Sequence, residues 1–127
     1  MLRHIALFSV LILWSSLVQA QDQPIPVYFE PLKGGEFTPL NKAIREALSQ
    51  PPLRLETKPG PQTVIISVPD KVDVQHKKVS GTFYGFTVAF SRDGRLLGES
   101  QQNCGLDTLS ECTDQIVLDV KSAAAPR

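Results

Sequence analysis

A run of alternating large and small side chains, residues 82–90, constrains the fold of this chain more than any other feature of its sequence. Successive side chains of a β-strand point to opposite faces, so one face would carry the large residues Tyr84, Phe86, Val88 and Phe90. The opposite face would carry Phe83, Gly85, Thr87 and Ala89. This contrast is typical of a sheet that is covered on one side only. The sequence therefore predicts a sheet whose aromatic face is buried under other elements.

Turn residues and β-branched runs place further strands around this one. Asp93-Gly94 predicts a tight hairpin with a return strand over residues 95–101. The β-branched run at residues 63–68 predicts a central strand, and Val72 and Val74 continue the extended structure. Shorter strands are expected at residues 27–29 and 53–55, the second of them at a sheet edge.

A helix is expected over residues 38–50, because its apolar residues recur with helical spacing: Leu40, Ala43, Ile44, Ala47 and Leu48. Thr38 would cap this helix and Pro39 would occupy its first turn.

A second helix is expected from about residue 107 to residue 121, with a capping box formed by Thr108 and Glu111. Its apolar stripe would consist of Leu109, Cys112, Ile116, Val117 and Val120.

The expected fold class is α+β, with the element order β-α-β-β-β-β-α. A mostly antiparallel sheet of four to five strands would carry both helices on its aromatic face. This single small domain would span residues 27–121. We expect a mobile leader at residues 21–26 and a frayed tail at residues 122–127.

Residues 1–20 have the three parts of a secretory signal peptide. A short positive start at residues 1–4 precedes an almost wholly apolar run at residues 5–18, and Val18-Gln19-Ala20 supplies the small residues that a signal peptidase recognises. The apolar run is shorter than the roughly 20 residues of a spanning helix, so cleavage is favoured over a membrane anchor. We expect a periplasmic or secreted protein that begins at Gln21 and does not span the membrane. The residue directly after the cleavage site is Gln21 and not a cysteine, so lipid attachment is not expected.

The charge of the mature chain argues against nucleic acid as a partner. The sequence has 13 basic and 13 acidic residues, and loss of residues 1–20 removes only Arg3. Twelve basic and thirteen acidic residues leave a net charge of −1. Nucleic-acid binding needs a basic footprint, which this balance does not supply.

The two cysteines, Cys104 and Cys112, are expected to form a disulfide, because exported chains fold in an oxidising compartment. Closing so short a loop is worth about 2–3 kcal/mol in the chain-entropy model. A redox-active pair would need a Cys-x-x-Cys spacing or an activated thiolate, and the spacing is absent.

Residue types that carry catalysis are scarce. The mature chain has one histidine, His76, with no partner evident in the sequence, and a zinc site would need three or four clustered ligands. Asp70 and Asp73 are expected to be solvated, and Gly34-Gly35 lacks the phosphate-loop pattern. The sequence therefore predicts a protein that is not an enzyme, with no catalytic residues, no metal and no cofactor.

Three features remain as candidate binding sites. Lys71, His76, Lys77 and Lys78 form a basic cluster that would either bind an anion or lie solvated on a strand connection. The sheet face that carries Phe83 and Ala89 would either meet a partner or stay exposed without a role. The loop closed by the disulfide, residues 104–112, would be pre-organised for docking.

The order of elements over residues 25–121 resembles a recurrent periplasmic α+β design. The likeness rests on Val27-Tyr28-Phe29, the helix at residues 40–48, the strands at 63–68 and 82–90, and the terminal helix. The chain looks like the lipopolysaccharide-assembly plug lipoproteins of Gram-negative bacteria, and is similar to the small amino-terminal domains of envelope translocation proteins. The resemblance implies a non-enzymatic accessory or assembly subunit. This sequence departs from it in lacking the lipidation cysteine and in having its own cysteine pair.

The expected function is that of an exported periplasmic binding or envelope-accessory protein that acts through one surface. Its partner would be an envelope protein or a small ligand. The alternative is a secreted inhibitor or immunity-type protein that places the 104–112 loop in the cleft of an enzyme.

Overall fold

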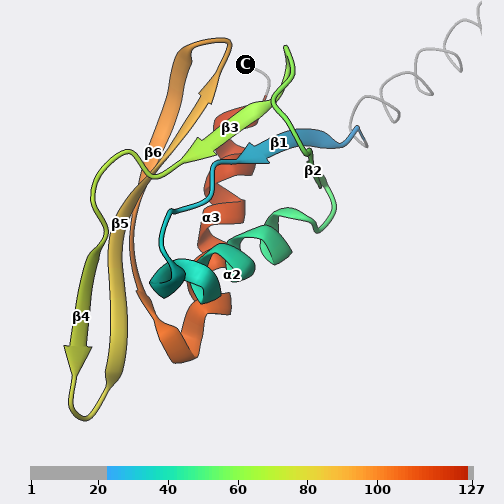
Figure 1. The fold of residues 1–127 in the computed structure, drawn as a ribbon. Coiled ribbons are helices and arrows are strands. Elements are labelled where there is room, and N and C mark those ends of the chain that lie inside the picture. Colours follow the sequence, from blue (N-terminus) through green and yellow to red (C-terminus); the bar gives the residue numbers. More distant parts are fainter. Residues whose placement is uncertain (1–22, 126–127) are drawn as a thin grey trace, which may run out of the picture.

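The computed structural model describes residues 23–125, which form six strands and two helices (Figure 1). The strands are β1 (Ile25–Phe29), β2 (Leu53–Leu55), β3 (Val64–Ser67), β4 (Asp73–Lys77), β5 (Gly81–Arg92) and β6 (Arg95–Gly105). The helices are α2 (Thr38–Leu48) and α3 (Leu109–Ala124), each preceded by a 3₁₀ turn, η1 (Gly35–Phe37) and η2 (Leu106–Thr108). The predicted signal peptide, residues 1–20, lies outside the described residues.

All six strands belong to one mixed sheet that is organised around β5. β6 runs antiparallel along one edge of β5. The other edge is shared, since β3 pairs with the end of β5 and β4 pairs with its start (Figure 1). β1 lies between β2 and β3 and is parallel to both. The expected α+β class with a mostly antiparallel sheet is confirmed, and the two parallel pairs lie together at one end.

The sheet has one strand more than the sequence pattern indicated, and the element order is β-α-β-β-β-β-β-α. The additional strand is β4, whose region was expected to continue as extended structure and then as a polar connection. Within Asp73–Lys77 the only apolar side chain is Val74, so the sequence shows no alternation of apolar and polar residues that would predict β4. Its backbone pairing with residues 81–85 of β5 holds it in the sheet instead.

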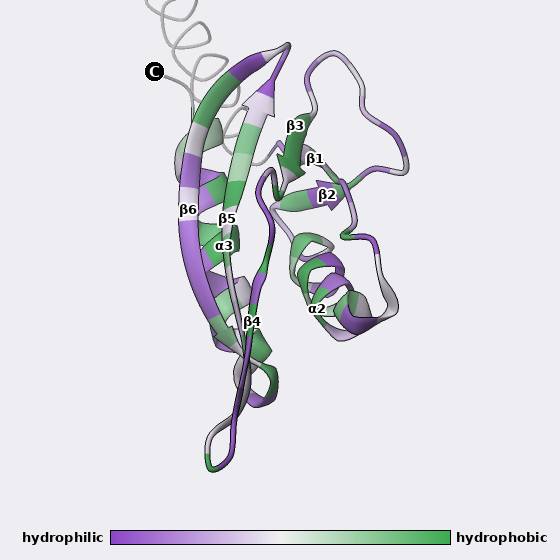
Figure 2. Cartoon of the chain, turned by 60° about the vertical axis from the view of Figure 1, so that its left-hand side comes forward, coloured by the Kyte–Doolittle hydropathy of each residue, from purple (hydrophilic) through white to green (hydrophobic). Residues whose placement is uncertain are grey.

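The aromatic face of β5 is buried, as predicted: Tyr84, Phe86, Val88 and Phe90 are each at most 5% exposed. Both helices pack on this face and meet one another there. From α2 come Leu40, Ile44 and Leu48, and from α3 come Ile116 and Val120. Burial of this continuous apolar cluster provides the main driving force for folding. Figure 2 shows the contrast with β6, which is hydrophilic over most of its middle.

The helix starts differ from the predicted caps. Thr38 is the first residue of α2 and already has helical dihedral angles, φ −55° and ψ −46°, because η1 leads directly into the helix. Phe37 occupies the N-cap position, and no side chain caps the helix. Thr108 does occupy the N-cap position of α3, but no side-chain capping bond forms there. The predicted capping box is therefore wrong.

The ends of the domain also differ from the expected boundaries. α2 ends at Leu48, two residues before the expected end at Gln50. β1 begins at Ile25, so the last two residues of the expected leader belong to the sheet. α3 begins at Leu109 and continues to Ala124, so residues 122–124 of the expected tail are helical.

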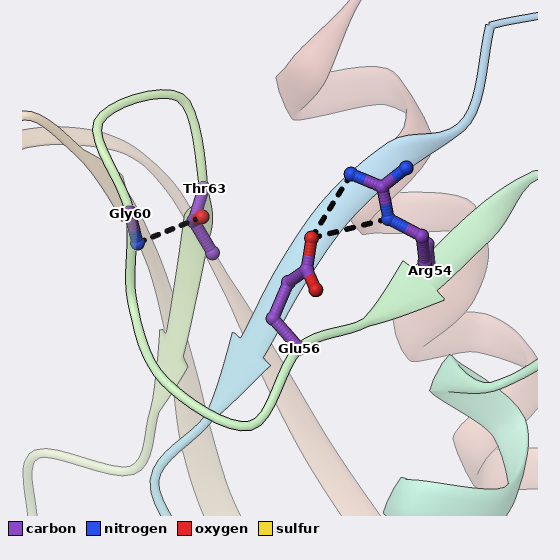
Figure 3. A network of polar contacts seen from close by, with 4 residues as sticks. All are labelled: Arg54, Glu56, Gly60 and Thr63. Carbon is purple, nitrogen blue, oxygen red and sulfur yellow. Dashed lines mark hydrogen bonds and ion pairs between the residues drawn. The ribbon is translucent and has the colours of Figure 1, made fainter.

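Short polar contacts hold the connection between β2 and β3 (Figure 3). Arg54 Nε and Nη2 both donate to one carboxylate oxygen of Glu56, at 3.1 and 3.0 Å. The Gly60 N–H donates to Thr63 Oγ1 at 3.0 Å, which closes the turn before β3. Both contacts are local and stabilise the turn at which the chain returns from the edge strand β2 to β3.

Candidate binding groove

An open groove of about 870 Å³ lies between the β4–β5 hairpin on one side and η1 with the segment before it on the other. Its apolar lining consists of Leu32, Phe37, Val72, Val74, Tyr84 and Leu106. Its polar lining consists of Glu36, Asp70, Lys71, Asp73, His76 and Thr82. Apolar walls with a few polar groups are the usual composition of a ligand site.

The hairpin supplies the longest wall of this groove. Val74 is the register partner of Tyr84, and His76 is the register partner of Thr82, so alternate residues of both strands point into the groove. His76 Nδ1 and Thr82 Oγ1 are 3.0 Å apart and share a hydrogen bond. This bond links the two strands beyond the part of β5 that the helices cover.

The opposite wall is fixed to the hairpin by Tyr84. The rings of Tyr84 and Phe37 meet edge to face, with centroids 6.2 Å apart and planes at 60°. The Tyr84 hydroxyl donates to the Glu36 carbonyl oxygen at 3.3 Å. The side chain of Asn41, in α2, forms two hydrogen bonds of 2.9 Å with the backbone N–H and carbonyl of Leu32. The Tyr84 contacts hold η1 against β5, and the Asn41 bonds hold the preceding segment against α2.

The charge of the groove is negative on balance. Its charged lining residues outside β4 are Glu36, Asp70 and Lys71. Asp73 also lines the groove, but its carboxylate accepts a hydrogen bond of 3.0 Å from Gln75, and its Cβ lies beside Gly85 on the outer face. The two carboxylates of Glu36 and Asp70 and the one ammonium group of Lys71 leave a net charge of −1. A groove with this balance attracts cationic groups.

The structure divides the basic cluster expected from the sequence. Lys71 and His76 line the groove together with Glu36 and Asp70. Lys77 points away from it, with its ammonium 5.0 Å from the centroid of the Phe83 ring on the outer face. Lys78 lies in the exposed turn between β4 and β5. The four residues therefore do not form one anion-binding surface.

The outer face of β5 is not covered by either helix. Phe83, Gly85, Thr87 and Ala89 are half-buried there, between side chains of the flanking strands. On the β6 side their register partners include the exposed polar residues Glu99, Gln101 and Asn103. The face is thus a mixture of small and polar groups without a continuous apolar area. Its composition is that of a solvated sheet surface.

The two cysteines are paired as a disulfide, with their Cα atoms 5.6 Å apart. The bond fastens the end of β6 to the first turn of α3. Between the cysteines the chain forms η2, so the 104–112 segment is a compact turn and not a projecting loop. Leu106 is 39% exposed and contributes to the lining of the groove.

A second connection between α3 and β6 consists of polar side chains. Ser100, which is buried, donates its hydroxyl proton to the Asp119 carboxylate. Gln115 Nε2 donates to the other oxygen of that carboxylate at 3.0 Å, and Gln102 donates to Ser100 Oγ. A nucleophilic serine would need a base such as histidine beside it. His76 is instead hydrogen-bonded to Thr82, in the β4–β5 ladder. We therefore assign this network to helix positioning.

Within residues 23–125, no three His, Cys, Asp or Glu side chains gather closely enough to hold a metal ion. None of the helices in this part of the chain is long and apolar enough to cross a membrane.

The sequence analysis did not identify Leu32, Glu36, Phe37 and Tyr84 as site residues. Tyr84 was expected only in the core, where most of its ring lies. Phe37 follows the Gly34-Gly35 turn, and an aromatic residue at a glycine turn ahead of a helix was the available signal. Its proximity to Tyr84 depends on the fold, because 48 residues separate the Tyr84 hydroxyl from its acceptor at Glu36.

No protein-family model matches this chain, and no curated protein matches it. Among solved structures, the chain is similar to a minor lipoprotein from Acinetobacter baumannii. The sequence identity is 10% and the TM-score is 0.43, over 80% of this chain and 95% of that one. The result is a weak resemblance to an envelope lipoprotein and defines no family.

Proposed function

We propose that this chain is an exported, non-enzymatic binding protein of the cell envelope, and that its groove holds an extended, basic segment of a partner protein. The observation that carries the proposal is the groove itself, with apolar walls and a net charge of −1, beside the edge strand β4. Export rests on the signal-peptide pattern of residues 1–20.

The edge strand supports an extended segment as the occupant. Among the described strands, β4 pairs only with β5, so its other edge presents backbone donors and acceptors without a strand partner. An extended peptide that adds to such an edge gains main-chain hydrogen bonds, and its alternate side chains enter adjacent pockets. Val72 and Val74 offer apolar contact on the groove side of this edge.

The groove charge supports a basic segment. Asp70 is exposed just before β4 and Glu36 is exposed at the facing turn, so a carboxylate lies on each side of the groove. Lysine or arginine side chains of a partner would lie between them and gain attraction that weakens with salt. A like-charged segment would be repelled, which gives the site selectivity.

Site-specific photocrosslinking in the native host tests this proposal. A photoreactive amino acid replaces Thr82, which points into the groove, or Thr87, which lies on the outer face of the same strand. We expect Thr82 to give a dominant adduct with one envelope protein, at a basic segment identified by mass spectrometry. The matched Thr87 position should give none. Adducts from Thr87 alone, or from neither position in a well-exported protein, would contradict a groove-binding function.

The charge argument has its own test in the same assay. The double substitution Glu36→Gln and Asp70→Asn removes two carboxylates from exposed positions and leaves the core unchanged. We expect the Thr82 adduct to weaken severalfold in this variant. Asp114→Asn with Glu111→Gln removes two exposed charges from α3 and serves as the control. An equal loss in both variants would mean that overall charge, and not the groove, attracts the partner.

The inhibitor alternative would use Leu106 and Asp107 of the disulfide-closed turn. The exposed side chain of Leu106 favours its participation in docking. An inhibitor that acts through the turn should lose potency when Leu106 and Asp107 are both replaced by alanine. The groove variant, Glu36→Gln with Asp70→Asn, should leave its potency intact. The opposite pattern would favour the groove.

A further inference from the structure

At the far end of the sheet from the groove, Arg92 and Arg95 face one another across the β5–β6 hairpin. They are register partners on either side of the turn formed by Asp93 and Gly94. Both turn residues have positive φ, 53° and 76°, as a tight two-residue hairpin turn requires. The turn therefore places two arginine residues directly opposite one another in the ladder, and like charges at such paired positions repel.

Nothing in the described part of the chain neutralises this pair. The ion pairs of residues 23–125 are Lys42–Glu46 and Arg54–Glu56, so neither hairpin arginine has a carboxylate partner there. Asp93 belongs to the turn itself but forms no ion pair with either side chain. Arg92 Nε is also buried without a hydrogen-bond partner. A buried donor without an acceptor is costly, and such groups call for an explanation, for example an unassigned ion.

Both arginines line a second cavity, of about 350 Å³, between the hairpin and the end of α3. Its other lining residues are Asp93, Leu96, Leu97, Ala123 and Ala125. Leu96 is 61% exposed, which places an apolar side chain at the mouth of the cavity. The carbonyl end of α3 and Asp93 contribute negative charge, but two full positive charges exceed them. The cavity is thus a cationic recess with an apolar rim.

We propose that Arg92 and Arg95 form a binding site for a phosphate group. A guanidinium presents several N–H donors in a planar fork that matches phosphate oxygens, and a tetrahedral phosphate can accept from two forks at once. Such a ligand would give Arg92 Nε an acceptor and would cancel the repulsion across the hairpin. Leu96 and Leu97 would contact an apolar group attached to the phosphate. The phosphate belongs either to a lipid headgroup or to a free phosphate ester.

Two binding measurements on the exported, purified protein test the site and separate these sources. The first titrates inorganic phosphate at low ionic strength by calorimetry. The second measures flotation with phosphatidylcholine vesicles, with or without phosphatidylglycerol. The test variant is Arg92→Gln with Arg95→Gln. The control, Lys42→Gln with Arg54→Gln, lowers the net charge equally but at exposed residues outside the cavity.

We expect the hairpin variant to lower the affinity by about tenfold or more, as the loss of charge-assisted hydrogen bonds predicts, and the control to match the unchanged protein. Phosphate binding without flotation supports a free phosphate ester. Flotation that requires phosphatidylglycerol and the two arginines supports a lipid headgroup. Because Arg95 is exposed, Arg95→Gln alone gives the same direction of change if the double variant unfolds. Absence of binding to both probes, or an equal loss in the control, overturns the proposal.

Discussion

Gly105 lies directly opposite Phe83 in the β5–β6 ladder, and the phenyl ring covers it. A Cβ atom at this position would lie 3.2 Å from Phe83 Cε1 and 2.9 Å from Thr108 Oγ1. The threonine can rotate away, but the ring must shift within the sheet. We therefore expect Gly105→Ala to lower the free energy of unfolding by about 1–3 kcal/mol.

Urea denaturation followed by circular dichroism measures this effect. Gly35→Ala is the matched control, because no atom lies within 4 Å of the added methyl group. Equal stability of the Gly105→Ala variant and the parent protein would show that the outer face tolerates a displaced Phe83 ring.

Ile116 and Leu118 test which face of α3 stabilises the fold. Ile116 is 1% exposed and packs in the core, while Leu118 is 56% exposed. Ile116→Ala removes buried methyl groups and leaves a cavity, so we expect a loss of about 2–5 kcal/mol in the free energy of unfolding. Leu118→Ala should change it by less than about 0.5 kcal/mol. A large loss at Leu118 would mean that another surface covers this side chain in solution.

At the scale of elements, the disulfide between β6 and α3 should contribute chain-entropy stabilisation. It closes a short segment, so the double substitution Cys104→Ser and Cys112→Ser should cost about 2–3 kcal/mol. The comparison is the unfolding midpoint in urea, with and without a reducing agent. Reductant should lower the midpoint of the parent protein and leave that of the double variant unchanged. A parent protein that is insensitive to reductant even when unfolded would contradict a formed disulfide.

The elements that could be predicted from the sequence are those with an apolar period of their own. β5 alternates large and small residues, and α2 and α3 each have one apolar stripe, so all three were identified with their buried faces. β4 was not identified as a separate strand, because only its backbone pairing defines it. The caps were mistaken because a 3₁₀ turn enters each helix, and its effect on the first helical residue depends on backbone geometry that residue types do not determine.

At the scale of the whole molecule, the groove could be predicted only in part. His76 and Lys71 were singled out from their local sequence, and both line it. The facing wall comes from residues 32–37, which β1 brings beside β5 by way of the parallel pairing of β1 with β3. A local pattern does not specify which distant strand β1 will join. The acidic balance of the groove was missed for the same reason, since only the fold brings Glu36 and Asp70 to the same groove.

The last prediction concerns processing of the whole chain. If residues 1–20 are a cleaved signal peptide, the exported protein should begin at Gln21 and contain 107 residues. Intact-mass and N-terminal analysis of protein recovered from the envelope fraction measures this directly. Ala20→Arg places a large charged residue where the peptidase requires a small one, so the uncleaved precursor should accumulate at the membrane. Gln19→Arg adds the same charge at the unrestricted middle position and should still be cleaved. Recovery of the full 127-residue chain from the unchanged protein would show instead that the apolar segment is retained as an anchor.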